Sequence, residues 1–236
     1  NVNRTIIGLY LTPSVCIGVP ALLIGQGNMK PYIRLILSSV AISSVLLSIY
    51  LGNRSLIVIF AALFILTILL GMQTKSRKWL LCLTFVLLIV AGVMIWNNKL
   101  WNIRGFISTS FLSKRIQAGQ VENPRLSIYA EIFENFTDYL LGWVTASATS
   151  ATISLSSAHN IWLDCFIYAG ILPAILLVIY SVRVFKDSLR AFSKCSNPLV
   201  CMITLCFAVG IMLNWAVEPV LYADPYYFAI CCGCFS

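Results

Sequence analysis

Residues 55–71 read SLIVIFAALFILTILLG, a run of 17 positions without a charged side chain. A helix of this length rises about 26 Å, close to the thickness of the hydrocarbon core of a bilayer. The rest of the chain repeats the pattern. Comparable apolar runs occur at residues 5–25, 34–51, 79–96, 160–182 and 199–217, and another begins near Tyr222. The sequence therefore predicts an all-α fold, a polytopic bundle of transmembrane helices.

The composition supports a membrane protein. Of 236 residues, 60% are hydrophobic and 10% charged, with a mean hydropathy of +0.91, whereas a soluble domain has about 25% charged residues. A cytosolic enzyme and a nucleic-acid-binding protein are excluded, although the net charge is +8. Because the chain begins at Asn1 without a basic leader and its last apolar run stops short at Ser236, we expect it to be part of a longer protein.

The basic residues predict the orientation. Connections at 30–34, 75–78 and 183–194 hold nine of the 16 Lys and Arg residues, and such connections face the cytoplasm. We therefore expect residues 1–96 to form four transmembrane helices, 97–158 an extracytoplasmic (periplasmic) loop, and 159–236 the C-terminal transmembrane helices, the last one incomplete. Residues 53–54 and 218–224 should lie on the same outer side as the loop.

The long outer loop has three parts. Its first part contains Lys99, Arg104, Lys114 and Arg115 without an acidic residue, so it should attract anions. The pair Asn123-Pro124 then predicts an amphipathic helix from about residue 125 to 141, because Asn favours the N-cap and Pro the first turn, and Gly142 should end it. The uncharged residues 144–157 could form a lid over a site or an idle linker.

Prolines and cysteines add local predictions. Pro13 and Pro20 should break up the first span, and Gly170 with Pro173 should kink the fifth. Eight of the nine cysteines lie in or beside apolar runs, and Cys195 lies in a basic connection. None lies in the long outer loop, so no disulfide framework is indicated. We expect the cluster at residues 231–234 to pack in a helix, since it lacks a second ligand pair for zinc. No metal site and no cofactor is predicted.

Three residues on the predicted outer side fall at helix starts: Arg54, Arg125 and His159. Helix N-termini attract anions, and guanidinium groups bind phosphate oxygens in a bidentate manner. Arg54 could equally contact lipid headgroups, and Arg125 could be a surface charge on an amphipathic helix. His159, the only histidine, could act as a general base or be structural.

Asn160 and Asp164 follow the histidine and are four residues apart, on one face of a predicted helix. A carboxylate near the hydrocarbon region needs a partner. Asp164 could orient a substrate sugar or a neighbouring side chain, or it could be a hydrogen-bonded packing residue. We treat Asn160, Asp164, Arg104, Lys114 and Arg115 as candidate substrate-binding residues.

The motif His159-Asn160, nine further residues and Gly170 resembles the histidine motif of the bacterial O-antigen ligase and polymerase superfamily. Asn1-Val2-Asn3 is similar to that family's Asn-Pro-Asn, Asn53-Arg54-Ser55 to its Ser-Arg, and Arg125 precedes Gly142 at a similar spacing. The order of these motifs agrees over nearly the whole chain. Two positions depart from the pattern: Val2 replaces a proline, and Pro173 stands where Gly, Thr or Val is usual.

The resemblance implies transfer of a glycan from an undecaprenyl-diphosphate carrier to a sugar hydroxyl, on the periplasmic face of the bacterial cytoplasmic (inner) membrane and without metal or nucleotide. Arg54 and Arg125 would hold the diphosphate, and His159 would take the proton of the hydroxyl. The acceptor would be a carrier-linked repeat unit, slightly favoured, or the lipid A core. A chain-length regulator or a flippase would be a possible partner. The alternatives are a transporter or flippase for an anionic or lipid-linked substrate, and a subunit that anchors a glycan assembly complex.

Overall fold

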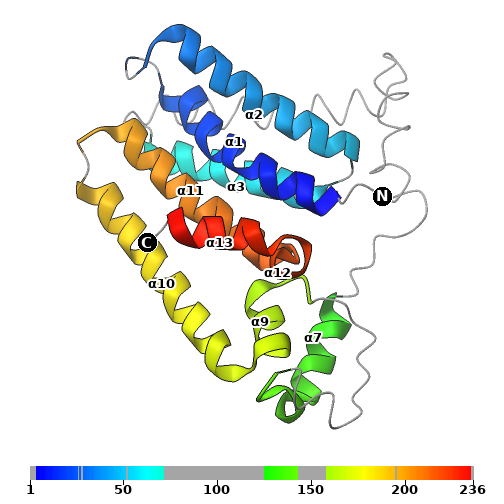
Figure 1. Cartoon of the computed structure of the whole chain (residues 1–236). Coiled ribbons are helices and arrows are strands. Elements are labelled where there is room, and N and C mark those ends of the chain that lie inside the picture. Colours follow the sequence, from blue (N-terminus) through cyan, green and yellow to red (C-terminus); the bar gives the residue numbers. More distant parts are fainter. Residues whose placement is uncertain are drawn as a thin grey trace.

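The computed structural model describes residues 4–25, 27, 29–51, 53–71, 125–142, 158–194 and 196–234. Within these residues every regular element is helical, so the predicted helical class is confirmed for the described part (Figure 1). The elements are α1 (Arg4–Ile24), α2 (Pro31–Leu51), α3 (Arg54–Gly71), α7 (Arg125–Glu134), the 3-10 helix η1 (Phe136–Tyr139), α9 (Ile161–Ala169), α10 (Ile171–Lys194), α11 (Pro198–Val217), α12 (Val220–Ala223) and α13 (Pro225–Cys234).

Three of these helices are long and apolar enough to cross a membrane, judged by length and composition: Ile6–Ile24 in α1, Pro31–Leu51 and Pro198–Val217. In α3 the apolar part, Ser55–Leu70, is somewhat shorter. Helices α1, α3 and α11 share one buried core, which includes Val15, Leu63 and Met202. The predicted span at 79–96 lies outside the described residues, and the polytopic bundle with its extracytoplasmic loop stays a prediction.

Helix α2 buries its small polar side and exposes its large apolar side. Its buried residues are Ser38, Ala41, Ser44 and Ser48, whereas Leu35 is 68% exposed. Gly18 of α1 brings the two backbones together, because a Cβ atom there would overlap Ala41. This arrangement is the reverse of that in a water-soluble helix and is typical of a helix that contacts lipid. It suggests that the chain is a membrane protein.

The prediction that proline breaks the first span is wrong. Helix α1 is one helix of 21 residues with Pro13 and Pro20 inside it. A membrane helix tolerates proline because neighbouring helices and hydroxyl side chains satisfy the freed backbone groups. In the same helix the Thr12 hydroxyl is satisfied within the helix, since its Oγ1 donates to the Gly8 carbonyl oxygen at 3.0 Å.

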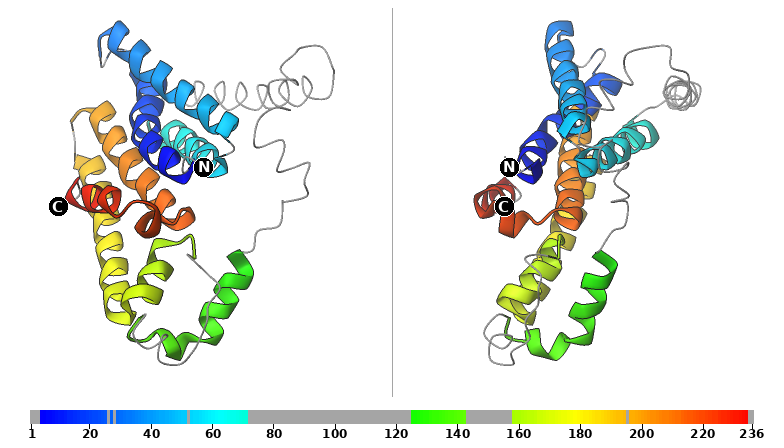
Figure 2. Two further views of the ribbon diagram at one scale, coloured as in Figure 1. Left: turned by 45° about the vertical axis from the view of Figure 1, so that its right-hand side comes forward. Right: turned by 90° about the vertical axis from the view of Figure 1, so that its right-hand side faces the viewer.

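The fifth apolar run, residues 160–182, is not one kinked span. Helix α9 ends at Ala169, and Gly170 takes φ 93° and ψ −177°, which no helix contains. The chain reverses there, and α9 and α10 lie side by side in both orientations (Figures 1 and 2). Trp162, near the start of α9, donates from Nε1 to Ser181 Oγ at 3.0 Å, deep in α10. The run therefore forms a helical hairpin.

The helix predicted over residues 125–141 is shorter than expected. Helix α7 ends at Glu134, and the chain continues through η1 to a turn at Gly142 rather than as one helix to residue 141. Gly142 lies directly against the reversal of the hairpin, where a Cβ atom would come within 2.7 Å of the Gly170 nitrogen. The Ile171 N–H also donates to the Leu140 carbonyl oxygen at 3.0 Å. These contacts hold the turn at residues 140–142 against the hairpin.

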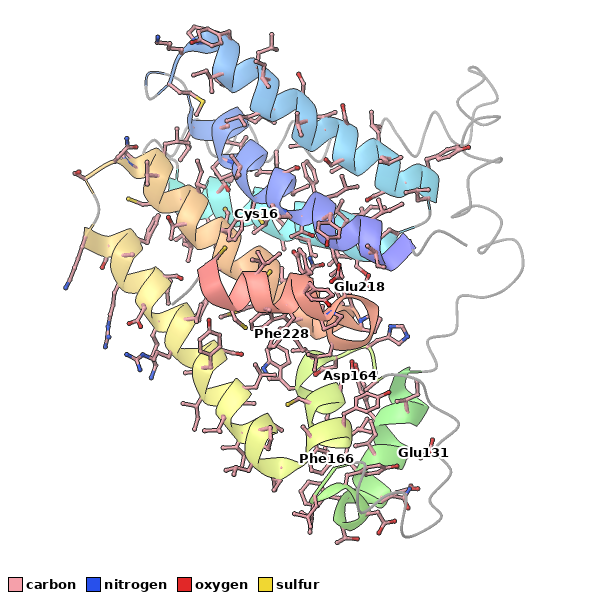
Figure 3. All side chains as sticks on the ribbon, in the orientation of Figure 1. Cys16, Glu131, Asp164, Phe166, Glu218 and Phe228 are labelled. Atoms are coloured by element: carbon pink, nitrogen blue, oxygen red, sulfur yellow. The ribbon has the colours of Figure 1, made fainter. Side chains whose placement is uncertain are left out.

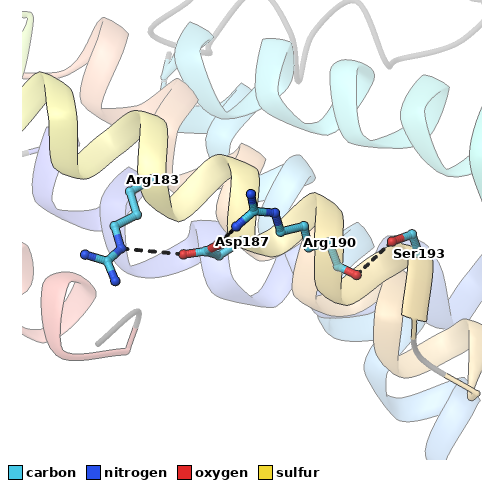
Figure 4. A network of polar contacts seen from close by, with 4 residues as sticks. All are labelled: Arg183, Asp187, Arg190 and Ser193. Atoms are coloured by element: carbon cyan, nitrogen blue, oxygen red, sulfur yellow. Dashed lines mark hydrogen bonds and ion pairs between the residues drawn. The ribbon is translucent and has the colours of Figure 1, made fainter.

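The basic segment 183–194, expected as a connection, is the second half of α10. Lys and Arg favour helix, so the basic residues extend the apolar run instead of ending it. Asp187 lies between two of them, with Arg183 Nε at 3.8 Å and Arg190 Nη1 at 3.2 Å (Figure 4). All three side chains are exposed, so these ion pairs contribute little to stability.

Two short helices lie where an incomplete seventh span was predicted to begin, near Tyr222. Helix α12 follows the end of α11, and α13 then runs for ten residues across it. In α13 Cys231 is buried, Cys232 half-buried and Cys234 exposed. Cys231 packs with Trp215 and Ile211 of α11. The packing role expected for this cluster agrees with Cys231, the buried member.

Candidate functional site

His159 lies in a turn of unusual backbone geometry. Its φ is 55°, the one positive φ at a non-glycine residue among those described. Left-handed backbone costs an L-residue about 1–2 kcal/mol, so the contacts around it must hold it. Such positions cluster at functional sites, which makes this turn the centre of the candidate site.

The residue after the histidine fixes the start of α9. Asn160 is the N-cap, and its Oδ1 accepts from the N–H groups of Trp162 and Leu163, each at 3.2 Å. Its Nδ2 donates to the Ala216 carbonyl oxygen at 3.4 Å, near the end of α11. The sequence predicted His159 in the first turn of the helix. In the structure His159 instead precedes the N-cap. Two N–H groups of that turn are already bonded to Asn160.

A buried carboxylate closes the same turn from the other side. Asp164 is fully buried, and its Oδ1 accepts from the Ala158 N–H at 2.6 Å. Figure 3 labels Asp164 on α9 and Glu218, the residue that caps the end of α11. Glu218 is also buried. The His159 turn is thus located where α9 and the end of α11 meet.

Arg54 is the first residue of α3, as predicted. The preceding Asn53 is buried and caps this helix, accepting from the Leu56 N–H at 3.2 Å. Asn53 also packs against Gly8 near the start of α1, where a Cβ atom would overlap its side chain. The start of α3 is therefore fastened to the start of α1.

Two polar contacts that the sequence did not predict tie the start of α1 to the C-terminal elements. Tyr10 donates to Asp224 Oδ2 at 2.7 Å, and Asn214 Nδ2 donates to Thr12 Oγ1 at 2.6 Å. The Tyr10 hydroxyl and then the Tyr227 N–H lower the pKa of Asp224.

An Asx-Pro pair at residues 224–225, like the one at 123–124, marks a helix start. Helix α12, which precedes Asp224, contacts α9.

Arg125 is the first residue of α7, as predicted. One turn later, Ile128 joins the buried cluster that contains Ala158, the residue before the histidine. Ile132, Tyr139 and Phe166 belong to the same cluster. Helices α7 and α9 therefore share one buried apolar cluster. Arg104, Lys114 and Arg115, and residues 144–157 with the proposed lid, lie outside the described residues.

An apolar groove of about 290 Å³ lies between α7, α9 and α10. Its walls include Phe133 of α7, Leu163 and Phe166 of α9, and Ile175 and Ile179 of α10. The groove continues into the exposed apolar side of α10, where Leu172 is 66% exposed and Ile179 58%. A surface of this kind binds hydrocarbon chains better than sugars or ions.

The chain has no match among models of known protein families, and none among curated protein sequences.

Proposed function

We propose that the chain is part of a membrane glycosyltransferase of the O-antigen polymerase or ligase type. It would transfer a glycan from an undecaprenyl-diphosphate carrier to a sugar hydroxyl at the periplasmic face of the bacterial inner membrane. The carrier-linked glycan, the acceptor glycan and the bilayer are the partners that this function requires. A carrier-linked repeat unit, the polymerase acceptor, is favoured over the lipid A core because the basic part of the outer loop suits a second diphosphate.

One observation carries the proposal. The starts of α1, α3 and α9 and the end of α11, far apart in the sequence, are joined by contacts, and the proposed site requires the start of α7 at the same end. The contacts that join them are Asn53 with Gly8, Tyr10 with Asp224, and Asn160 with Ala216. Arg54, Arg125 and His159 belong to these helix starts. An arrangement of two arginines and one histidine suits a diphosphate leaving group and a proton acceptor.

The reaction would proceed by displacement at the anomeric carbon. The acceptor hydroxyl oxygen forms a bond to that carbon while the bond to the diphosphate oxygen breaks, and His159 takes the hydroxyl proton. Arg54 and Arg125 would stabilise the negative charge that develops on the departing diphosphate. The isoprenoid chain of the carrier would lie in the apolar groove beside α9, within reach of the same end of that helix.

The test compares His159→Ala, Arg54→Ala and Arg125→Ala with the control Arg190→Ala. Arg190 is an exposed arginine on α10 whose side chain pairs with Asp187 (Figure 4). In membrane vesicles given a carrier-linked glycan, each of the first three changes should lower transfer about 100-fold or more. The control should retain wild-type transfer. Full transfer by folded His159→Ala protein would refute the proposal.

A transporter or flippase is the second candidate, and the hairpin is the observation that favours it. Helix α9 has nine residues, too few to span a bilayer, and ends in a sharp reversal. Transporters often build binding sites from such broken helices. Movement of a lipid-linked anion across sealed vesicles, undiminished in His159→Ala protein that transfers no glycan, would support this candidate instead.

A further inference from the structure

Asp164 bonds backward to the turn from which its own helix starts. Its Oδ1 accepts from the Ala158 N–H at 2.6 Å, and its backbone N–H donates to the Asn160 carbonyl oxygen at 2.8 Å. These two bonds hold the residues on either side of His159. The side chain of Asp164 is fully buried, and so is Ala158. The carboxylate therefore acts on the backbone of the turn.

The rest of the turn is held by contacts of the same kind. Asn160 caps α9 and also reaches the Ala216 carbonyl oxygen, which fixes the turn against α11. Ile161, the first helical residue, is fully buried beside Trp215. His159 itself is only half-buried, with the left-handed φ of 55°. The geometry thus fixes the backbone of the turn, while His159 as a residue is partly exposed and its Nδ1 atom is buried.

A hydrogen bond to an ionised carboxylate is roughly twice as strong as one between neutral groups, and low dielectric surroundings strengthen it further. We propose that Asp164 is a positioning residue: its bond to Ala158 holds the strained turn that aims His159 at the acceptor hydroxyl. The part of this inference that concerns catalysis rests on the proposed function. Because the Asp164 carboxylate is fully buried and bonded to the backbone, it is poorly placed to contact a sugar directly.

The activity test uses Asp164→Ala and Asp164→Asn. Alanine removes the acceptor, whereas asparagine keeps an oxygen at the same place with less charge. Since a misplacement of about 1 Å can cost about 100-fold in rate, we expect kcat to fall about 100-fold in Asp164→Ala, with KM within about twofold of wild type. Asp164→Asn should fall less, by about 10-fold, as a partial rescue.

Asn197 supplies the matched control. It caps α11 as Asn160 caps α9, accepting from the Leu199 and Val200 N–H groups at 3.0 and 3.3 Å. It lies at the other end of α11 from Ala216. Asn197→Ala therefore removes helix-cap contacts of a similar kind, at an exposed position, without touching the His159 turn, and kcat should not change.

A second measurement does not depend on catalysis. The chain contains one histidine, so ¹⁵N-histidine labelling of protein purified without a histidine tag gives the imidazole signals of His159 alone. These signals should shift in Asp164→Ala and Asp164→Asn protein and stay in place in Asn197→Ala protein. Unchanged signals in both Asp164 variants would overturn the positioning role. Shifted signals in a protein without transferase activity would support it and refute the proposed function.

If Asp164→Ala protein does not fold, Asp164→Asn decides the question. A KM effect without a kcat effect in the folded variant would place Asp164 in substrate binding and overturn the inference.

Discussion

The contact between Gly142 and Gly170 gives the sharpest prediction about the fold. Gly170 has φ 93° and ψ −177°, a region that is almost restricted to glycine. A Cβ atom there would come within 2.7 Å of the Leu140 oxygen and 3.1 Å of the Gly142 nitrogen, both backbone atoms that cannot rotate away. Gly170→Ala should therefore strain the reversal and push the turn at residues 140–142 off the hairpin.

The size of the effect follows from two contributions. The backbone conformation costs an alanine about 1–3 kcal/mol, and forcing an atom into packed neighbours costs about 1–3 kcal/mol more. The free energy of unfolding should fall by the sum, about 2–6 kcal/mol. Unfolding of the purified protein in mixed detergent micelles, titrated with SDS, measures it.

Two other glycines separate the contributions. Gly27 has φ 81° and nothing within 4 Å of a Cβ atom, so Gly27→Ala should cost only the backbone strain, about 1–2 kcal/mol. Gly233, in α13, also has open space and no positive φ, so Gly233→Ala should stabilise by about 0.5–1 kcal/mol. Gly170→Ala protein as stable as Gly233→Ala protein would refute the reasoning. Stability equal to that of Gly27→Ala would refute the close contact.

Further predictions concern the polar contacts at the same end of the molecule. Asn160→Ala removes the cap of α9 and should lower the free energy of unfolding by about 1 kcal/mol in the same SDS titration; no change would argue against the cap. Thr12→Val leaves buried Asn214 without its acceptor and should cost about 1–3 kcal/mol, and a neutral result would contradict the 2.6 Å bond. The pKa of Asp224 is lowered from 3.8, chiefly by Tyr10, so this carboxylate stabilises the fold above pH 3.8 and loses its effect as pH falls through the lowered pKa. Tyr10→Phe should therefore be less stable than wild type at neutral pH and approach it in acid, and a difference that does not vary with pH would count against the contact.

Local signals in the sequence predicted the long helices well. Apolar runs with few charges predicted α1, α2, α3 and α11. Most of the predicted ends lie within a few residues of the observed ends. The start of α3 could be predicted because Asn53 is a good N-cap and the apolar run follows it directly. The starts of α3 and α7 at Arg54 and Arg125 come from such local preferences.

The hairpin could not be predicted because its cause lies elsewhere in the chain. Residues 160–182 are mostly apolar, with Asp164 as the one charged residue, and a single glycine within such a run is common in membrane helices. The reversal depends on backbone contacts of Gly170 with residues 140–142. The bonds of Tyr10 with Asp224 and of Asn214 with Thr12 join residues 214 and 202 positions apart, so no local pattern reports them.

The proposed function requires that the starts of α3, α7 and α9 meet at one end of the molecule. Distances between spin labels test this requirement most directly. After replacement of the nine native cysteines, one label at position 159 is paired with a label at position 54 or 71, the two ends of α3. Since α3 has 18 residues and is about 26 Å long, the label at 54 should be closer to 159 than the label at 71, by on the order of 20 Å. In the same way, position 125 should be closer to 159 than position 134, the other end of α7. Equal distances, or position 71 closer than position 54, would contradict a shared site.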